Sequence, residues 1–139
     1  MNRIIISLGS YLEGILNMAS SLSKNIGPSY VKVDCYIKED FKEQLSKYYK
    51  VPIDKINLLK TNETLESALS NWFGNENKII ESITYWFNLK VKGAKVIYYS
   101  EEELKNILDN KQMDFYCLDD LFFVESKEYI FVFQLGNNE

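Results

Sequence analysis

The sequence contains no histidine, and cysteine and proline occur only twice each. Without histidine the chain has no imidazole for general base catalysis, for metal coordination or for a pH switch near neutrality. Cys35 and Cys117 are too few for a zinc site or a disulfide scaffold, so we expect free thiols in a reducing cytoplasm, with one structural disulfide as the alternative. The six glycines are scattered and form no phosphate-binding loop. We therefore expect no cofactor and no metal site.

The length of 139 residues predicts a single domain covering residues 1–139. Hydrophobic residues make up 46% of the chain and charged residues 26%, which is typical of a globular domain. No apolar run is long enough to span a membrane. The N-terminus has a basic residue and an apolar run, as a secretion signal does, but Glu13 interrupts that run. We therefore expect a cytoplasmic protein.

Charge is distributed unevenly along the chain, although the net charge is only −4. Residues 1–99 carry 13 basic and 10 acidic side chains, whereas residues 100–139 carry 3 and 10. Such a segment can simply form a solvated acidic surface that has no binding role. Alternatively, it can form an electrostatic face that binds a basic partner. The acidic segment argues against nucleic-acid binding by this third of the chain, and no helix-turn-helix with a basic recognition helix is present.

The first segment of the chain fits two secondary structures. Apolar residues recur every three or four positions, which predicts one long amphipathic helix; they are Ile5, Leu8, Leu12, Ile15, Ala19, Leu22 and Ile26. Alternatively, Ser10 and Glu13 form a capping box that would start a helix at Tyr11, after a short strand over residues 3–8. We favour the single helix, because the apolar spacing continues through the proposed break. Gly27 and Pro28 end the helix in either case.

The middle of the chain alternates between strand and helix patterns. The stretch YVKVDCYI predicts a half-buried strand, and KEDFKEQLSKYYKV predicts a helix that ends before Pro52. Two helices follow between residues 61 and 89, and each ends in a Trp-Phe pair. We assign these pairs to core packing, because no dense set of basic residues surrounds them as a platform for single-stranded nucleic acid would require.

The C-terminal part of the chain predicts a strand, a helix and a hairpin. AKVIYYS has the pattern of a strand, and Ser100 with Glu103 forms a capping box for a helix over EEELKNILDN. The last two apolar runs predict adjacent strands that are buried on both faces and joined at Glu125-Ser126-Lys127. Together these elements predict an α+β fold, with a mostly antiparallel sheet of about four or five strands packed with three to five helices.

One stretch of this hairpin has the spacing of a metal-dependent nuclease. Asp119 or Asp120 precedes an apolar strand that ends in Glu125 and Lys127, where carboxylates would hold Mg²⁺ and the lysine would position an attacking water. Only one further strand follows, whereas that nuclease core needs a helix and a strand. A nuclease also needs a positive surface for phosphates. We keep a Mg²⁺-dependent nuclease as an alternative and predict that the protein is not an enzyme.

Many aromatic residues and a steep charge asymmetry, without a catalytic constellation, are typical of a protein that binds another protein. We expect the acidic side chains of the last third to meet a basic partner surface; the candidates are Glu101, Glu102, Asp119, Asp120, Glu125 and Glu128. Basic surfaces occur on toxin nucleases, which must hold phosphates. Carboxylates that take the place of phosphates bind such surfaces fast and tightly.

With its acidic residues Asp119, Asp120, Glu125 and Glu128 around an aromatic hairpin, the chain resembles the small acidic immunity proteins of bacterial contact-dependent growth inhibition and related polymorphic-toxin systems. This resemblance covers the whole chain in size, acidity and α+β character. It implies a cytoplasmic protein that neutralises one cognate toxin domain by direct contact. A phage-encoded inhibitor of a host defence protein is an open alternative, and a homodimer formed through the apolar hairpin is a further one.

Overall fold

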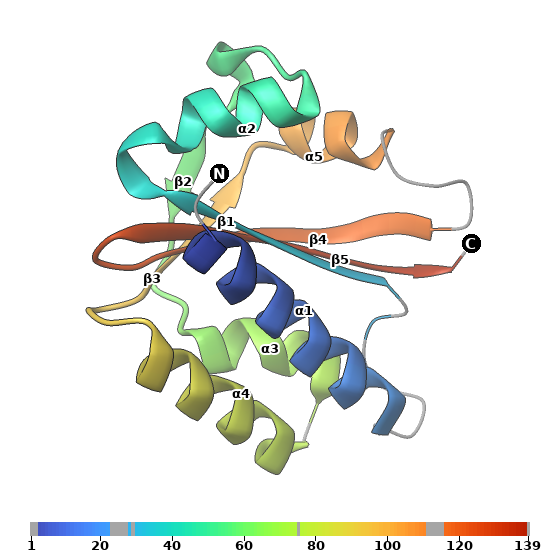
Figure 1. The fold of residues 1–139 in the computed structure, drawn as a ribbon. Coiled ribbons are helices and arrows are strands. Elements are labelled where there is room, and N and C mark those ends of the chain that lie inside the picture. Colours follow the sequence, from blue (N-terminus) through green and yellow to red (C-terminus); the bar gives the residue numbers. More distant parts are fainter. Residues whose placement is uncertain (1–2, 23–27, 29, 75, 111–115, 139) are drawn as a thin grey trace.

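The computed structural model describes residues 3–22, 28, 30–74, 76–110 and 116–138, and Figure 1 shows their arrangement. Within these residues five α-helices and five strands form one compact unit, which confirms the α+β class expected from the sequence. The strands pair antiparallel in the order β1-β5-β4-β3-β2. The elements are α1 (Arg3–Leu22), β1 (Tyr30–Ile37), α2 (Phe41–Tyr49), β2 (Leu58–Lys60), α3 (Leu65–Phe73), α4 (Asn77–Lys90), β3 (Val96–Ser100), α5 (Glu102–Asp109), β4 (Tyr116–Glu125) and β5 (Tyr129–Asn138), with short 3-10 turns at Lys38–Asp40 and Ile53–Lys55.

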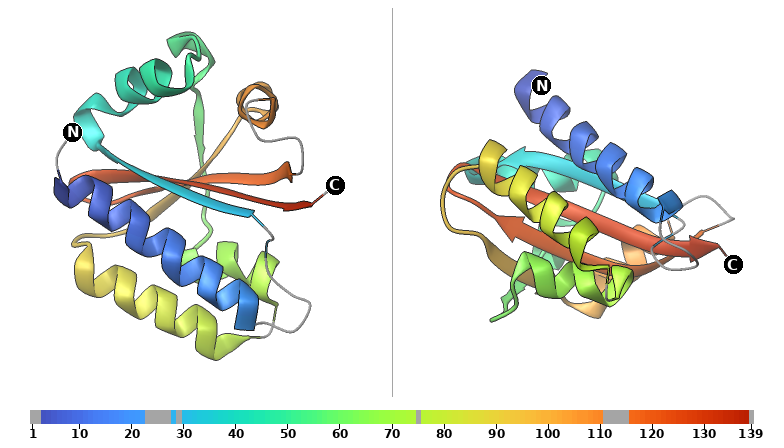
Figure 2. Two further views of the ribbon diagram at one scale, coloured as in Figure 1. Left: turned by 45° about the vertical axis from the view of Figure 1, so that its right-hand side comes forward. Right: turned by 90° about the horizontal axis from the view of Figure 1, so that it is seen from below.

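Helices cover both faces of the sheet and divide the hydrophobic core into two parts. Helices α1, α3 and α4 pack on one face, and α2 and α5 pack on the other (Figure 1). Figure 2 shows α1 and α4 side by side against the sheet, and the ring of Tyr11 stacks on that of Trp86 at a centroid distance of 5.6 Å. We refer to the two faces of the sheet as the α4 side and the α2 side.

The hairpin of β4 and β5 forms the centre of the sheet, as the apolar runs predict. Leu121 to Val124 and Ile130 to Phe133 are buried on both faces, and the Phe122 and Phe133 rings stack at 4.7 Å. Strand β1 pairs with β5 from Tyr30 to Ile37, and β3 pairs with β4. Because β5 has a neighbour on each side, it offers no free edge to a second copy of the chain.

Helix α1 is one continuous element, which confirms the long amphipathic helix, and the Ser10–Glu13 capping box does not form. Ser10 lies inside the helix, and Glu13 instead accepts a hydrogen bond from the backbone N–H of Val33 at 2.6 Å. Because β1 is an edge strand, the N–H of Val33 would otherwise lack a backbone acceptor. Gly9 permits the close approach, since a Cβ there would lie 2.9 Å from the carbonyl oxygen of Val33. The helix therefore covers the edge of β1. Gly27 lies outside the described residues.

We expect Glu13→Ala to lower the free energy of unfolding by about 1–2 kcal/mol, because the Val33 N–H loses its acceptor where water has poor access. Ser10→Ala is the matched control in the same helix and should change stability by less than about 0.5 kcal/mol. Chemical denaturation of the two variants measures both values. Equal losses would mean that Glu13 has no special role at the sheet edge.

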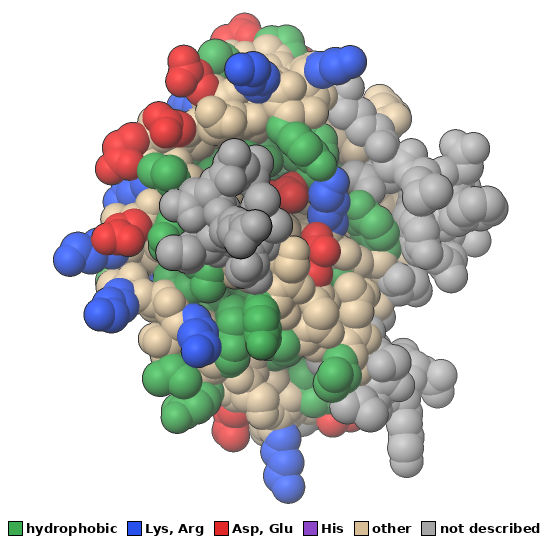
Figure 3. All heavy atoms as spheres, viewed as in Figure 1, with side chains coloured by type: hydrophobic (Ala, Val, Ile, Leu, Met, Phe, Trp, Pro, Cys, Tyr) green, Lys and Arg blue, Asp and Glu red, His purple; other side chains and the backbone are tan. Residues whose placement is uncertain are grey.

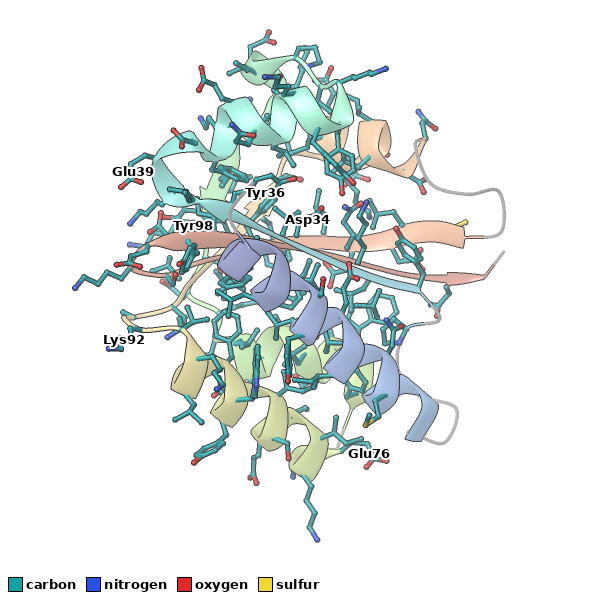
Figure 4. All side chains as sticks on the ribbon, viewed as in Figure 1. Asp34, Tyr36, Glu39, Glu76, Lys92 and Tyr98 are labelled. Carbon is teal, nitrogen blue, oxygen red and sulfur yellow. The ribbon has the colours of Figure 1, made fainter. Side chains whose placement is uncertain are left out.

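A buried polar network joins α2 to the sheet on the α2 side. Gln134 is fully buried and donates from Nε2 to the Tyr49 hydroxyl at 2.9 Å, and that hydroxyl donates to Asp34 Oδ2 at 2.5 Å. Figure 4 labels Asp34 on this face of the sheet. Burial raises the pKa of Asp34 above its ordinary value, against the opposing effects of the Tyr49 hydrogen bond and Lys32. No buried side-chain atom of these three residues lacks a hydrogen-bond partner, so we interpret the network as structural.

The second capping box expected from the sequence is also absent. The Ser100 hydroxyl donates to the carbonyl oxygen of Glu101 at 3.0 Å, and Glu101 occupies the N-cap position of α5 without a side-chain hydrogen bond to the helix. Ser100 is instead the last residue of β3, where pairing with Leu58 fixes its backbone. The pairing of strands takes precedence here over the local signal for a helix start.

Candidate functional site

The six acidic residues expected to bind a partner lie at two separate ends of the sheet. Asp119 and Asp120 lie near the start of β4, and Glu125 is its last residue. Glu125 follows Asp120 by five positions along the extended strand, which corresponds to about 16 Å. Glu128 lies in the β4–β5 turn beside Glu125, whereas Glu101 and Glu102 lie at the start of α5. The residues therefore do not form one surface.

At the turn end of the sheet, basic residues offset the acidic ones. Glu125 Oε1 lies 3.6 Å from Lys38 Nζ and accepts a hydrogen bond from the Tyr98 hydroxyl at 3.5 Å. Glu128 adjoins Lys127 in the sequence and lines a hollow together with Lys92 and other residues. Figure 3 shows blue and red side chains intermixed at this end of the molecule, and Figure 4 labels Lys92 there. This end is consequently not an acidic surface.

The other end of the sheet has a β-bulge that changes the direction of the acidic side chains. Leu118 pairs with Gly136 and Asp120 with Leu135, so Asp119 is the extra residue. The bulge leaves Asp119 exposed and places Asp120 on the α4 side, while Leu118 joins the core of the α2 side. Gly136 is required opposite the bulge, because a Cβ there would collide with the carbonyl oxygen of Cys117.

Asp120 lies beside a tryptophan, a tyrosine and a second carboxylate from three other parts of the chain. Its Oδ2 accepts a hydrogen bond from Trp72 Nε1 of α3 at 3.0 Å. Burial raises the pKa of Asp120; Trp72 and Lys105 oppose that rise, and Glu63 adds to it. The pKa of Tyr99 is also raised, first by burial and then by Glu63 and Asp120. Because these side chains affect one another's pKa values, Asp120, Trp72, Tyr99 and Glu63 lie close together.

The carboxylate of Glu63 is only weakly hydrogen-bonded in this neighbourhood. Its Oε1 accepts a long hydrogen bond from the Ser67 hydroxyl at 3.5 Å. Its Oε2 is shielded from solvent and has no donor of regular geometry among the described residues, although the Tyr99 hydroxyl lies close enough for a hydrogen-bonding interaction with Glu63 to raise the pKa of Tyr99. A buried carboxylate oxygen with poorly aligned donors is costly, and a cation is the group that would compensate it best.

The start of α5 brings further carboxylates to the same end of the sheet. Glu101 and Glu102 are exposed, and Lys105 lies 4.0 Å from Glu102 while it also acts on Asp120. Lys55 lies on the other side of this helix start, where it pairs with Glu103 at 3.1 Å and is also acted on by Glu101. Glutamates in the first turn interact favourably with the helix dipole, and this structural effect is sufficient to explain the negative charge at the start of α5. We define the acidic end as Glu63, Glu101, Glu102, Asp119 and Asp120.

The first half of β4 forms a free edge of the sheet, and the carboxylate of Asp109 caps it. Strand β3 pairs with β4 only from Phe122 to Glu125, so the first half of β4 extends beyond it. Asp109 Oδ1 accepts the hydrogen bond of the Leu118 N–H there, at 2.8 Å. This bond and the bulge disfavour the addition of another strand, so a partner would contact side chains at the acidic end.

Asp120→Asn should raise the melting temperature at pH 7 by roughly 2–5 °C. Because folding raises the pKa of Asp120, the folded chain binds this proton more tightly than the unfolded chain, and stability falls as the pH rises through the folded pKa. Asparagine can still accept the Trp72 hydrogen bond but carries no charge. Thermal unfolding from pH 4 to pH 7 measures the effect, which should shrink in acid; a gain that grew in acid would contradict it.

The residues of the nuclease alternative are not brought together. Asp120 pairs with Leu135 in the core of the α4 side, whereas Glu125 pairs with Ile130 in the core of the α2 side. Cross-strand partners share a face, so the two carboxylates point to opposite sides of the sheet. Among the residues described here, no group of three or more acidic or cysteine side chains is arranged to hold a metal ion. The alternative remains a prediction that this geometry does not favour.

Comparison of the chain with protein-family models, with curated protein sequences and with solved structures finds no match. Within the described part of the chain, no helix is long and apolar enough to cross a membrane. The sequence reasoning missed Glu63, Trp72 and Tyr99, because they approach Asp120 only through the fold. It assigned Trp72 to core packing, and the partly buried indole ring does pack against the core of the α4 side while its Nε1 donates to Asp120.

Proposed function

We propose that this protein is a cytoplasmic immunity protein that neutralises a cognate toxin domain by binding its basic surface with the acidic end. The protein would act without catalysis, as an inhibitor that occupies the site where the toxin holds phosphates. Carboxylates in this position would steer a basic partner during encounter and would pair with it in the complex.

The proposal rests above all on two half-buried carboxylates in one neighbourhood, Asp120 and Glu63, of which the Glu63 Oε2 has no donor of regular geometry among the described residues. Glu63 raises the pKa of Asp120 and Lys105 opposes that rise, so a further cation beside the two carboxylates would stabilise their charges. The indole ring of Trp72 adds an aromatic face on which a guanidinium group can stack. An arginine or lysine side chain from a partner could pair with the two carboxylates and pack against the indole ring at the same time.

Exposed carboxylates surround this site at the sheet edge. Asp119 is exposed at the bulge, where Asn137 Nδ2 donates to its Oδ2 at 3.3 Å, and Glu101 is exposed at the N-cap of α5. Exposed rim charges contribute mainly to the rate of association, and the half-buried pair contributes mainly to the lifetime of the complex. The arrangement thus has the two parts that fast and tight binding requires.

A growth assay tests this function directly. The proposal predicts that a neighbouring reading frame encodes the toxin domain, which would be induced in cells with and without the chain. We expect growth only in cells that contain the chain, and we expect the Glu63→Gln/Asp120→Asn variant to protect them poorly. A chain that gives no protection, or a variant that protects as well as the unaltered chain, would contradict the proposal.

A further inference from the structure

At the turn end of the sheet, three lysines line one hollow of about 420 Å³. Lys90 is the last residue of α4, Lys92 follows it, and Lys127 comes from the β4–β5 turn. The turn is held against the loop by the Lys127 N–H, which donates to the carbonyl oxygen of Lys92 at 3.4 Å. Gly93 has φ +93° and leaves no room for a side chain, because a Cβ there would lie 2.8 Å from Lys127 Cβ. The close approach of the two backbones gathers these lysines.

The local structure does not need these three ammonium groups. Lysines near the end of a helix commonly compensate its free carbonyl groups. Here Lys95 does so, because its Nζ donates to the carbonyl oxygens of Val91 and Gly93 at 2.6 Å each. None of Lys90, Lys92 and Lys127 forms an ion pair with another described residue. Glu128 is the one carboxylate in the described lining, so positive charge is in excess.

The floor of the hollow is apolar. Leu8 of α1, Val91 and the partly buried ring of Tyr129 line it, together with Ser126. The Ser126 hydroxyl is already engaged, because it donates to the carbonyl oxygen of Tyr129 and accepts from its N–H. An apolar floor with a cationic rim suits a molecule that has a flat apolar body and a multiply charged anionic group. The volume lies within the range of about 300–1,000 Å³ found for small-molecule sites.

We propose that this hollow binds a small phosphate-bearing molecule with an aromatic body, the phosphates meeting Lys90, Lys92 and Lys127 and the aromatic ring lying against Tyr129. This site lies at the other end of the sheet from the acidic end and does not depend on the proposed function. Lysine ammonium groups serve here as point charges, which accommodate phosphates of varied geometry.

Calorimetric titration of the full chain with adenosine 5′-diphosphate tests the proposal, with inorganic pyrophosphate and adenosine as separate arms. We expect adenosine diphosphate to bind with a dissociation constant below about 1 mM at low salt. Pyrophosphate should bind more weakly because it lacks an aromatic body, and adenosine should not bind measurably. Absence of saturable binding of the diphosphate, or equal affinity for pyrophosphate, would overturn the proposal.

Three variants make the test specific to the hollow. Lys92→Gln/Lys127→Gln should weaken binding of the diphosphate about tenfold or more, and Glu128→Gln should strengthen it, because repulsion is removed. Lys78→Gln, at an exposed position in the first turn of α4, is the control and should leave affinity unchanged. Circular dichroism confirms that each variant is folded. A Lys78 variant that weakens binding as much as the lysine pair would overturn the site.

Discussion

Phe122→Ala is expected to lower the free energy of unfolding by about 3–5 kcal/mol. Phe122 is fully buried in the central strand β4, where it stacks on Phe133 and meets the Tyr99 ring edge-on at 6.4 Å. Removing the ring would leave a cavity between the two central strands and the helices of the α4 side, because neighbouring side chains can fill it only in part. A loss of this size is a large fraction of the stability of a typical domain.

Tyr85→Ala provides the control for this prediction. Tyr85 is also aromatic, but 71% of its surface is exposed on α4. We expect its removal to change the free energy of unfolding by less than about 0.5 kcal/mol. Urea or guanidinium denaturation of both variants measures the difference. A loss below about 1.5 kcal/mol for Phe122→Ala would show that the two central strands are packed more loosely than the structure indicates.

Glu63→Gln/Asp120→Asn is expected to weaken binding of the toxin partner by about 100-fold or more, mainly through faster dissociation. The variant removes two half-buried charges that a partner cation would meet, and it leaves that cation without compensation in the complex. The same change should stabilise the free protein, because burial raises the pKa of Asp120 and charging it costs stability at neutral pH. Lower affinity together with higher stability distinguishes a binding site from a structural cluster.

Asp34→Asn is the matched control for this pair. Asp34 is also a carboxylate whose pKa is raised by burial and which accepts a hydrogen bond from an aromatic side chain, Tyr49. It lies on the α2 side of the sheet, in a network in which no buried side-chain atom lacks a hydrogen-bond partner. We expect its neutralisation to leave affinity for the partner unchanged. Equal weakening by both variants would indicate a general loss of structure instead of a local site.

Periodicity in the sequence predicted those parts of the fold that depend on local pattern. The spacing of apolar residues gave one long helix for α1, and the two apolar runs gave the enclosed hairpin of β4 and β5. Both signals are strong because they extend over many residues, and burial against the sheet requires them. The capping boxes at Ser10 and Ser100 are four-residue signals, and strand pairing and sheet-edge contacts overrode them.

The candidate site depended on non-local geometry that the sequence does not display. A single extra residue at Asp119 changes which face Asp120 occupies, and the letters CLDDLFF carry no sign of a bulge. Glu63 precedes Asp120 by more than 50 positions, and the pairing of β2 and Thr61 with β3 brings them together. Charge counting found the right segment but could not separate Asp119 and Asp120 from Glu125, which ends the same strand beside Lys38.

The most direct test of the account is the association rate constant of the toxin domain with two variants of equal charge change. Glu101→Lys/Glu102→Lys/Asp119→Lys alters exposed residues of the acidic end, and Glu39→Lys/Glu43→Lys/Glu128→Lys alters exposed residues elsewhere. Stopped-flow measurements at low and moderate salt would compare both variants with the unaltered chain. We predict that the first variant associates about 10- to 100-fold more slowly, with a weaker dependence on salt, and that the second changes the rate by less than about threefold. Equal slowing by both variants, or no slowing by the first, would contradict the claim that the acidic end receives the partner.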